Sequence, residues 1–279
     1  MEEAKTPQEL SALKKNRFIG PAPSQMKNSL IRFYGSDNIL FCENAAKFLN
    51  CQILFFASNS LVYLSDSTDV YTIHADLYND TNIYIGNNCR FNPQPLRIIL
   101  SEQSSFFAGD RCLLANATVR TADAHLIYNA ATLKRINPTR NVYVGDHAWI
   151  AQSVLLLKGT RVSSGSIIGA NSVVSGKNIP HNTSWGGNPA RYISSNIFWE
   201  SSCVHSWTEK QTSLSQDFRK YAPAKNVSTD EWIYTYDEKE YIPFDTIGEH
   251  LHHKYSPDER LEYLKTLAET RTKNRFAFN

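Results

Sequence analysis

Residues 144–174 read VGDHAWIAQSVLLLKGTRVSSGSIIGANSVV, and this stretch decides the fold. An amphipathic helix repeats its apolar face every three to four residues and a half-buried strand every two. Here the repeat is six, which is typical of very short strands joined by tight corners. Three hexapeptides close one coil, and stacked coils bury a continuous core. The stretch therefore predicts a parallel β-helix, whose inward aliphatic residues are Val144, Ile150, Leu156, Val162, Ile168 and Val174.

Weaker copies of the same design extend the prediction toward the N-terminus. They centre on Phe41, Leu64, Ile85 and Ala108, at spacings of 23, 21 and 23 residues. A coil of about eighteen residues with a few more at one corner accounts for these spacings. We therefore predict a β-helix over residues 29–194.

An interruption follows Ala108, because the next copy begins 36 residues later at Val144. The six-residue rhythm stops near Asp123 and restarts at Val142, which predicts a protruding loop over about residues 121–141. Loops carried by a rigid scaffold are where functional residues concentrate. Cys89 and Cys112, by contrast, each lie four residues after an inward position and are predicted to be small apolar fillers.

The two ends of the chain lack hexapeptides. Residues 1–28 are polar and predict an N-terminal arm, with a possible short helix around Gln8–Lys15. Residues 195–279 are aromatic and charged and predict a C-terminal extension. Within it, Trp232–Tyr236 and Tyr241–Phe244 are candidate strands.

The last helix has clear start signals. Ser256 is a suitable N-cap, Pro257 suits the first turn and Glu259 completes a capping box, which predicts a helix over about 257–272. The predicted fold class is therefore mainly β: a parallel β-helix with a mixed α/β C-terminal extension.

Composition excludes several classes of protein. The 29 Lys and Arg nearly balance the 27 Asp and Glu, so no nucleic-acid partner is expected. No run of eighteen apolar residues occurs and the N-terminus lacks the apolar segment of a signal peptide, so we expect neither a membrane span nor secretion. The five cysteines form no CxxC pair, which favours reduced thiols in the cytoplasm.

Four motifs resemble those of the left-handed β-helix, hexapeptide-repeat O-acetyltransferases. They are Asp123-Ala-His125, NVYVGDHAWI at 141–150, Ile168-Gly-Ala170 and Gly187-Asn-Pro-Ala190. The branch most alike acetylates bacterial capsular polysaccharides and sialic acids, and the resemblance is strong over about residues 80–195. It implies a left-handed coil, acetyl-CoA as cosubstrate, no metal, and a bacterial, cytoplasmic homotrimer with its sites between subunits.

The resemblance also assigns catalytic roles. His125 would be the general base that takes the proton of a sugar hydroxyl as it attacks the thioester. Asp123 would fix the imidazole tautomer or contact the acceptor, although a solvated loop aspartate fits equally. Trp149 would lie beside the base and place the sugar or the acetyl donor, and the backbone N–H of Gln152 would stabilise the oxyanion.

Coenzyme A contacts follow from the same resemblance. Ala151 stands where the family usually has glycine, and the amide of Ala170 would bind the pantetheine. Lys177 would meet a phosphate, in a segment that is one residue longer than usual. The residues expected to line the adenine end are Asn188, Pro189 and Arg191.

These features predict an acetyl-CoA-dependent O-acetyltransferase of a carbohydrate, such as a bacterial surface polysaccharide. N-acetylation of an amino sugar and a non-catalytic trimeric binding protein remain alternatives. A γ-class carbonic anhydrase would need three histidines converging on zinc. Only His125 and His147 lie in the strong repeat region, with His74 far upstream. His147 is predicted to face solvent or a neighbouring subunit.

Overall fold

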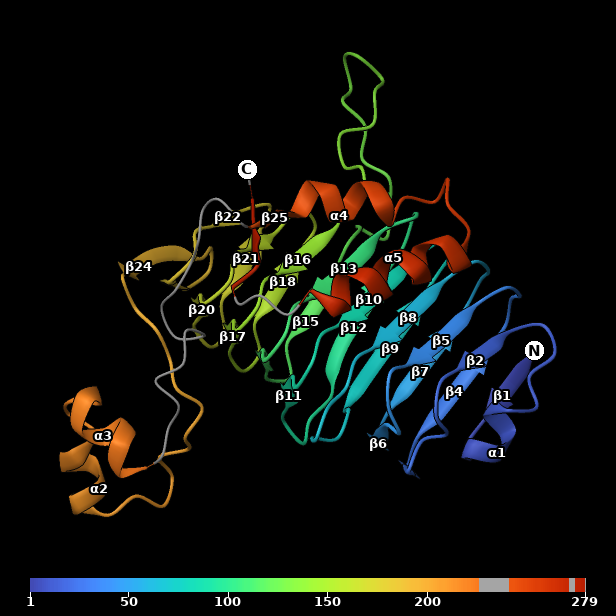
Figure 1. Ribbon diagram of the computed structural model, residues 1–279. Coiled ribbons are helices and arrows are strands. Elements are labelled where there is room, and N and C mark those ends of the chain that lie inside the picture. The colour runs from blue at the N-terminus through green and yellow to red at the C-terminus, as the bar shows by residue number, and fades with distance from the viewer. Residues whose placement is uncertain (226–240, 271–273, 279) are drawn as a thin grey trace.

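The structure, a computed structural model of the chain, describes residues 1–225, 241–270 and 274–278. Its body is a column of about seven stacked coils whose walls are three sheets (Figure 1). Each complete coil passes from the first sheet to the second and then to the third. The prediction of a parallel β-helix is confirmed.

Short strands build each wall. The first sheet consists of β1 (Glu2–Ala4), β4 (Leu30–Phe33), β7 (Gln52–Phe55), β9 (Ile73–Leu77), β12 (Leu96–Leu100), β15 (Thr118–Arg120), β18 (Leu155–Leu157) and β21 (Val173–Ser175). The second consists of β2 (Arg17–Ile19), β5 (Ile39–Cys42), β8 (Leu61–Leu64), β10 (Asn82–Ile85), β13 (Ser105–Ala108), β16 (Val142–Val144), β19 (Arg161–Val162) and β22 (Asn178–Ile179). The third consists of β11 (Arg90–Phe91), β14 (Leu113–Leu114), β17 (Trp149–Ile150), β20 (Ile167–Ile168), β23 (Thr183–Gly186) and β24 (Arg191–Ser195). In the first coils β3 (Gln25–Lys27) and β6 (Lys47–Leu49) pair separately.

The interior of the column is filled by the residues that set the repeat. Val144, Ile150 and Leu156 are buried, as are the three that follow them at six-residue intervals. Burying one such side chain contributes roughly 1.5–3 kcal/mol relative to leaving it exposed. Cys89 and Cys112 are buried beside them, which confirms the prediction that they are fillers.

The corner between the second and third sheets requires a left-handed backbone. Asn88, Arg111 and His147 occupy it in successive coils, with φ of 52°, 56° and 51°. They stack because the Arg111 N–H donates to Asn87 O and the His147 N–H donates to Asp110 O, at 2.6 and 2.7 Å. Asn and His adopt this conformation more readily than most residues, whereas it is unfavourable for arginine.

The N-terminal segment belongs to the column, so the prediction of an arm over residues 1–28 is wrong. β2 pairs in parallel with β5, and β1 pairs antiparallel with β4. The arm was predicted because the first strands carry polar residues that hide the repeat. α1 (Pro7–Leu10) is shorter than the helix predicted around Gln8–Lys15. The opposite end also reverses, since β24 runs antiparallel to β23.

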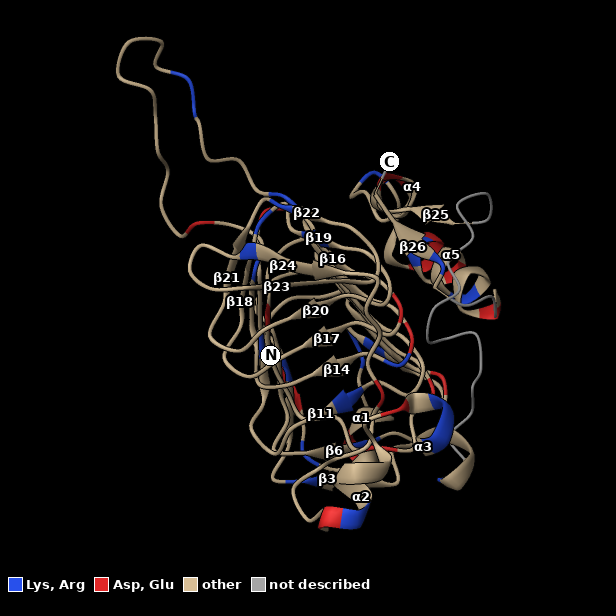
Figure 2. Cartoon of the chain, turned by 90° about the vertical axis from the view of Figure 1, so that its left-hand side faces the viewer, with Lys and Arg blue, Asp and Glu red and all other residues tan. Residues whose placement is uncertain are grey.

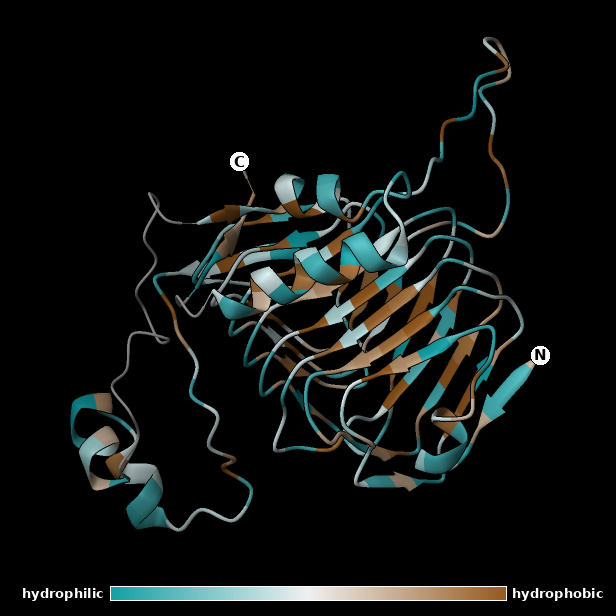
Figure 3. Cartoon of the chain, turned by 45° about the vertical axis from the view of Figure 1, so that its right-hand side comes forward, coloured by the Kyte–Doolittle hydropathy of each residue, from teal (hydrophilic) through white to brown (hydrophobic). Residues whose placement is uncertain are grey.

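The C-terminal extension contains two pairs of helices. α2 (Glu209–Leu214) and α3 (Phe218–Ala224) lie away from the column (Figure 1). α4 (Phe244–His250) and α5 (Pro257–Glu269) lie across the outer face of the second sheet, as Figure 3 shows. The predicted C-terminal helix is confirmed over Pro257–Glu269, and residues 271–272 lie outside the described residues.

The two predicted strands of the extension have different outcomes. Trp232–Tyr236 lies outside the described residues. For Tyr241–Phe244, the strand is only β25 (Ile242–Pro243), which pairs with β26 (Phe276–Ala277). Phe244 instead begins α4, because its ring stacks on Tyr143 of the second sheet at 5.1 Å between centroids.

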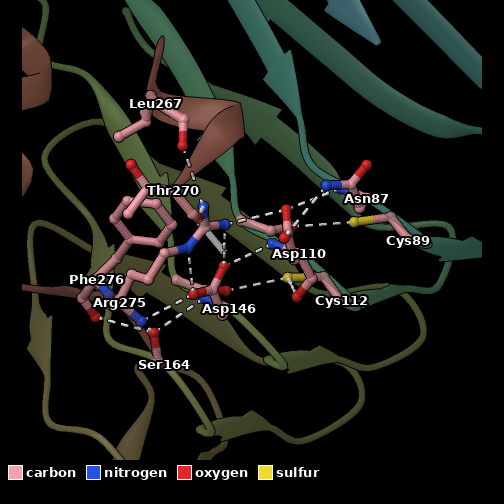
Figure 4. A network of polar contacts seen from close by, with 12 residues as sticks. Asn87, Cys89, Asp110, Cys112, Asp146, Ser164, Leu267, Thr270, Arg275 and Phe276 are labelled. Carbon is pink, nitrogen blue, oxygen red and sulfur yellow. Dashed lines mark hydrogen bonds and ion pairs between the residues drawn. The ribbon is translucent and has the colours of Figure 1, made fainter. Parts of the chain in front are cut away.

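A buried ion cluster fastens the last strand to the coil (Figure 4). The Arg275 guanidinium donates to both carboxylate oxygens of Asp146, at 2.9 and 3.0 Å, and lies 3.0 Å from Asp110. All three side chains are buried. Burial, and after it the charge of Asp146, raises the pKa of Asp110. The C-terminal segment is therefore held by charge as well as by aromatic packing.

Candidate active site

The loop over residues 121–141 leaves the column at the corner between the first and second sheets, between β15 and β16. Figures 1 and 2 show it standing away from the coils. Its two arms are joined by the Ile136 N–H, which donates to Ile127 O at 2.9 Å. The protruding loop was predicted from the break in the repeat, and His125 lies exposed on it.

Asn137 holds the base of this loop together. Its amide nitrogen donates to the carbonyl of His125 at 2.8 Å and to Asp123 Oδ2 at 2.9 Å. Its amide oxygen accepts from the Ile127 N–H at 2.9 Å and from Arg135 Nε at 3.3 Å. Asn137 is only 5% exposed, in a loop that is otherwise mostly exposed. One side chain thus fixes the backbone on both sides of His125.

Asp123 contacts a lysine rather than the imidazole that the resemblance suggested. Lys158 Nζ, which follows β18, lies 2.6 Å from Asp123 Oδ2 and 3.2 Å from the Asn137 carbonyl. The hydrogen bond from Lys158, followed by that from Asn137, lowers the pKa of Asp123. Within the described residues, the His125 ring has no hydrogen-bond partner, so it is available to a ligand.

A second tie links the loop to the preceding coil. Arg135 donates to both carboxylate oxygens of Glu102, each at 2.9 Å. Paired parallel hydrogen bonds of this kind fix orientation as well as distance. The arm that returns from the loop tip is therefore oriented by the rigid coil below it.

The loop presents an unusual number of large apolar side chains to solvent. They are between 49% and 78% exposed, and they are Leu126, Ile127, Tyr128, Leu133 and Ile136. Contiguous exposed apolar groups mark surfaces that contact another molecule. In this chain they lie on the same loop as His125.

The tryptophan predicted beside the base lies on another wall. Trp149 is on β17 of the third sheet, where its ring centroid lies 5.9 Å from that of Trp199. The loop that carries His125 begins at the corner between the first and second sheets. The structure therefore does not bring Trp149 and His125 together within one chain.

His147 is buried, which corrects the prediction that it faces solvent or another subunit. Its ring stacks on Trp199 at 4.3 Å, and Trp199 Nε1 donates to the His147 carbonyl at 2.8 Å. Burial lowers the pKa of His147. No local pattern predicts this contact, because Trp199 lies 52 residues further along the chain.

The residues predicted to bind coenzyme A divide between two edges of the first sheet. Ala151, Gln152 and Ala170 lie where the chain passes from the third sheet to the first. Neither the Gln152 N–H nor the Ala170 N–H donates to an acceptor among the described residues. An amide that binds a ligand must have its N–H available in this way. Asn188 and Pro189 lie between β23 and β24, and Arg191 begins β24.

Lys177 lies apart from these residues. It follows β21 at the corner between the first and second sheets, on the same edge of the column as the loop. Its Nζ is 5.8 Å from the centroid of the Trp185 ring. One chain therefore carries its predicted cofactor residues on two separate edges.

The histidines considered for zinc are dispersed. His74 lies on β9, His125 on the loop and His147 at the corner before β17. Across residues 1–225, 241–270 and 274–278, no three His, Cys, Asp or Glu side chains gather as a metal site would require. In the same residues, no helix has both the length and the apolar character needed to cross a membrane.

The parallel β-helix, with His125 on a loop at one corner, is shared with known acetyltransferases. No protein-family model matches the chain. It is 24% identical over 206 residues to a polysialic acid O-acetyltransferase of Neisseria meningitidis, covering 73% of this chain and 95% of that protein. It is 25% identical over 187 residues to a galactoside O-acetyltransferase of Lactococcus lactis, covering 66% and 70% of the two chains.

A solved structure agrees with these relatives in its fold. The polySia-specific acetyltransferase NeuO superposes with a TM-score of 0.61 and 22% identity, over 77% of this chain and 95% of that one. The resemblance to hexapeptide-repeat acetyltransferases is thus confirmed, and the chain is an acyltransferase.

Three residues of the loop base were missed from the sequence: Asn137, Arg135 and Lys158. A signal for Asn137 existed, since an asparagine directly before Pro138, where the repeat is about to resume, favours a turn. Lys158 had no such signal, because its contact with Asp123 spans 35 residues.

Proposed function

We propose that the chain is an acetyl-CoA-dependent O-acetyltransferase that acylates a hydroxyl of an anionic carbohydrate polymer. The proposal includes a homotrimer acting in the bacterial cytoplasm. The acceptor follows from the relatives, one of which acts on polysialic acid by its name. The reaction transfers the acetyl group from the thioester sulfur to the sugar oxygen, and the enzyme passes the hydroxyl proton to the leaving sulfur, which gives free coenzyme A.

His125 would be the general base. A sugar hydroxyl is a weak nucleophile, and proton removal by a placed imidazole typically contributes 10²- to 10⁴-fold in rate. The exposed ring has no partner within the described residues, and Asn137 holds its backbone at 2.8 Å. The imidazole can therefore reach an acceptor without first breaking a contact of its own.

Trp149, Gln152 and Ala170 would form the other half of the site on a second copy. Trp149 would contact the acceptor and the thioester, and Ala170 would bind the pantetheine amide. A backbone N–H such as that of Gln152, aimed at the developing oxyanion, is commonly worth about 10²–10³ in rate. Lys177, Asn188, Pro189 and Arg191 would hold the nucleotide end of coenzyme A, and Asp123 serves the loop through Lys158.

One observation supports a site shared between two subunits. His125 and Trp149 lie on different edges of one chain, and five large apolar side chains on the same loop as His125 are between 49% and 78% exposed. A second copy that covers this loop would bury those side chains and bring its own Trp149 to the base. Closed symmetry then repeats the same contact at every interface.

Complementation between two inactive variants tests the proposal. His125→Ala and Trp149→Ala are each expected to remove most acceptor-dependent release of coenzyme A thiol. In random mixtures of the two, about one site in four receives an intact histidine and an intact tryptophan, so about a quarter of the wild-type rate should return. Two variants that stay inactive when co-expressed, although they assemble, would contradict a site shared between copies.

A further inference from the structure

A cavity that no proposed catalytic step uses lies at the corner between the second and third sheets. It has a volume of about 280 Å³, and its lining includes Thr68, Asp69, Arg90, Arg111, His147 and Trp199. The arginines belong to adjacent coils, since Arg90 lies on β11 and Arg111 just precedes β14. The cavity therefore spans two adjacent coils of the column.

The charges in this cavity suit a carboxylate. Among the described residues that line the cavity, Arg90 and Arg111 are accompanied by one acidic residue, Asp69. Arg90 is held loosely, at 3.5 Å from Asp69 and 3.4 Å from the Ser201 carbonyl. Guanidinium groups bind carboxylates through planar, paired hydrogen bonds. A carboxylate could therefore replace these long contacts with shorter ones.

The buried imidazole supplies an acceptor for a hydroxyl. His147 Nε2 lies 3.1 Å from the Trp199 carbonyl, so Nε2 carries the hydrogen and Nδ1 is left as an acceptor. Nδ1 is buried without a partner among the described residues, and the His147 side chain is only 9% exposed. A buried acceptor without a donor is rare in proteins and points to a missing group.

The backbone gives independent support for the role of Arg111. It has a φ of 56° at a corner where the neighbouring coils place Asn88 and His147. Asparagine is the residue that this conformation favours, and an arginine there is disfavoured. The guanidinium therefore occupies this corner at some cost to the fold, as expected when it contacts a ligand.

Trp199 connects the cavity with Trp149 of the proposed acceptor site. Trp199 stacks on His147 at 4.3 Å on one side and lies 5.9 Å from Trp149 on the other. We infer that the cavity binds a carboxylate-bearing sugar unit of the acceptor polymer, separate from the unit that is acetylated. This inference rests on the proposed function, because it takes the acceptor to be a carbohydrate polymer.

Binding to an inactive enzyme tests the inference without turnover. In the full-length His125→Ala protein, calorimetry would measure the dissociation constants of a sialic acid tetramer, a galactose tetramer and coenzyme A. Adding Arg90→Gln and Arg111→Asn should raise the dissociation constant of the sialic acid tetramer at least tenfold. The values for the galactose tetramer and coenzyme A should not change.

Two controls separate binding from folding. Arg111→Asn removes the charge but suits the left-handed corner, so thermal stability should not fall with it. Arg219→Gln removes a guanidinium from α3 whose side chain is 90% exposed, and it should leave binding unchanged.

Five outcomes would overturn the inference. Unchanged affinity for the sialic acid tetramer in the double-arginine variant would show that Arg90 and Arg111 do not bind its carboxylates. Weaker binding of coenzyme A instead would assign the arginines to its phosphates, and displacement of the tetramer by equimolar inorganic phosphate would make the cavity a general anion site. If the His125→Ala protein binds both tetramers equally well, the inferred carboxylate subsite is wrong, but the proposal of a carbohydrate acceptor is kept. If it binds neither, the proposed acceptor fails with it.

Discussion

Two polar clusters tie distant parts of the chain to the β-helix, and they differ in burial. The Arg275 cluster, with Asp110 and Asp146, is buried and fastens the C-terminal strand. The Asn137 cluster lies at the foot of the exposed loop, where the Asp123 side chain is 46% exposed. Buried charges are costly to leave unpaired, whereas exposed pairs contribute little to stability. The first cluster should therefore govern stability, and the second should govern the position of His125.

The largest expected effect comes from removing the buried cation. Arg275→Met leaves Asp110 and Asp146 buried beside each other without a counter-charge. Breaking a buried pair in this way typically costs about 3–5 kcal/mol of the free energy of unfolding. Urea denaturation at pH 7 would measure it, with Arg219→Met, at an exposed position on α3, as the control.

The pH dependence of the Arg275→Met variant tests whether uncompensated charge causes its loss of stability. The pKa of Asp110 is already raised by burial and by Asp146, and losing Arg275 raises it further. A carboxyl whose folded pKa lies above its unfolded value favours folding below the unfolded pKa, and this is lost as pH rises through the folded value. The variant should therefore be closer to wild type at pH 4.5 than at pH 7. Equal losses at both pH values would show that charge is not the cause.

The second effect falls on rate instead of stability. Asn137→Ala removes the donor that holds the His125 carbonyl at 2.8 Å. Displacing a catalytic group by about 1 Å can cost on the order of 10²-fold, so kcat should fall 10- to 100-fold while KM for acetyl-CoA stays the same. The free energy of unfolding should change by only about 1 kcal/mol.

A variant cycle separates positioning from general damage. In a His125→Ala background, Asn137→Ala should lower the residual rate no further, because the histidine it positions is absent. Asn129→Ala is the matched control, since the Asn129 side-chain oxygen accepts from the Ala131 and Thr132 N–H groups at the loop tip, away from His125. Additive losses in the cycle would count against positioning through His125.

An intermediate effect is expected at His147, which is buried but uncharged. Burial lowers its pKa, so its stabilisation is complete above the ordinary histidine pKa of about 6.5 and is lost as pH falls through the lowered value. Acidification should therefore release the stacked Trp199, with a change in tryptophan fluorescence. His147→Asn should abolish that transition, and its persistence in the variant would assign it elsewhere.

The smallest effect is expected from the exposed ion pair. Lys158→Met removes the contact with Asp123 at 2.6 Å but leaves the hydrogen bond from Asn137 to Asp123. Exposed pairs contribute about 0–1 kcal/mol, and salt weakens them. The melting temperature should shift by no more than a few degrees, and 1 M NaCl should remove most of the difference between variant and wild type. A loss as large as that of Arg275→Met would end the distinction between the clusters.

What the sequence could predict depended on the range of the contacts. The hexapeptide repeat is local, so the coil, the break near Asp123 and the exposed place of His125 could all be predicted. The start of the column could not, because Glu2–Ala4 and Gln25–Lys27 carry the polar residues of a surface segment. Arg275 with Asp146 and His147 with Trp199 join residues 129 and 52 positions apart, and no local pattern specifies such partners.

The reversed strands at both ends of the column set how this molecule can vary in length. β1 and β24 run against their neighbours, so parallel stacking stops at one end of the first sheet and at the opposite end of the third. Gain or loss of whole coils inside the column would change its length without disturbing these two reversed strands. Changes between β5 and β12 would move the N-terminal end relative to the loop without altering the coils that carry His125 and Trp149. Such changes would alter the length of the column while leaving the proposed reaction centre unchanged.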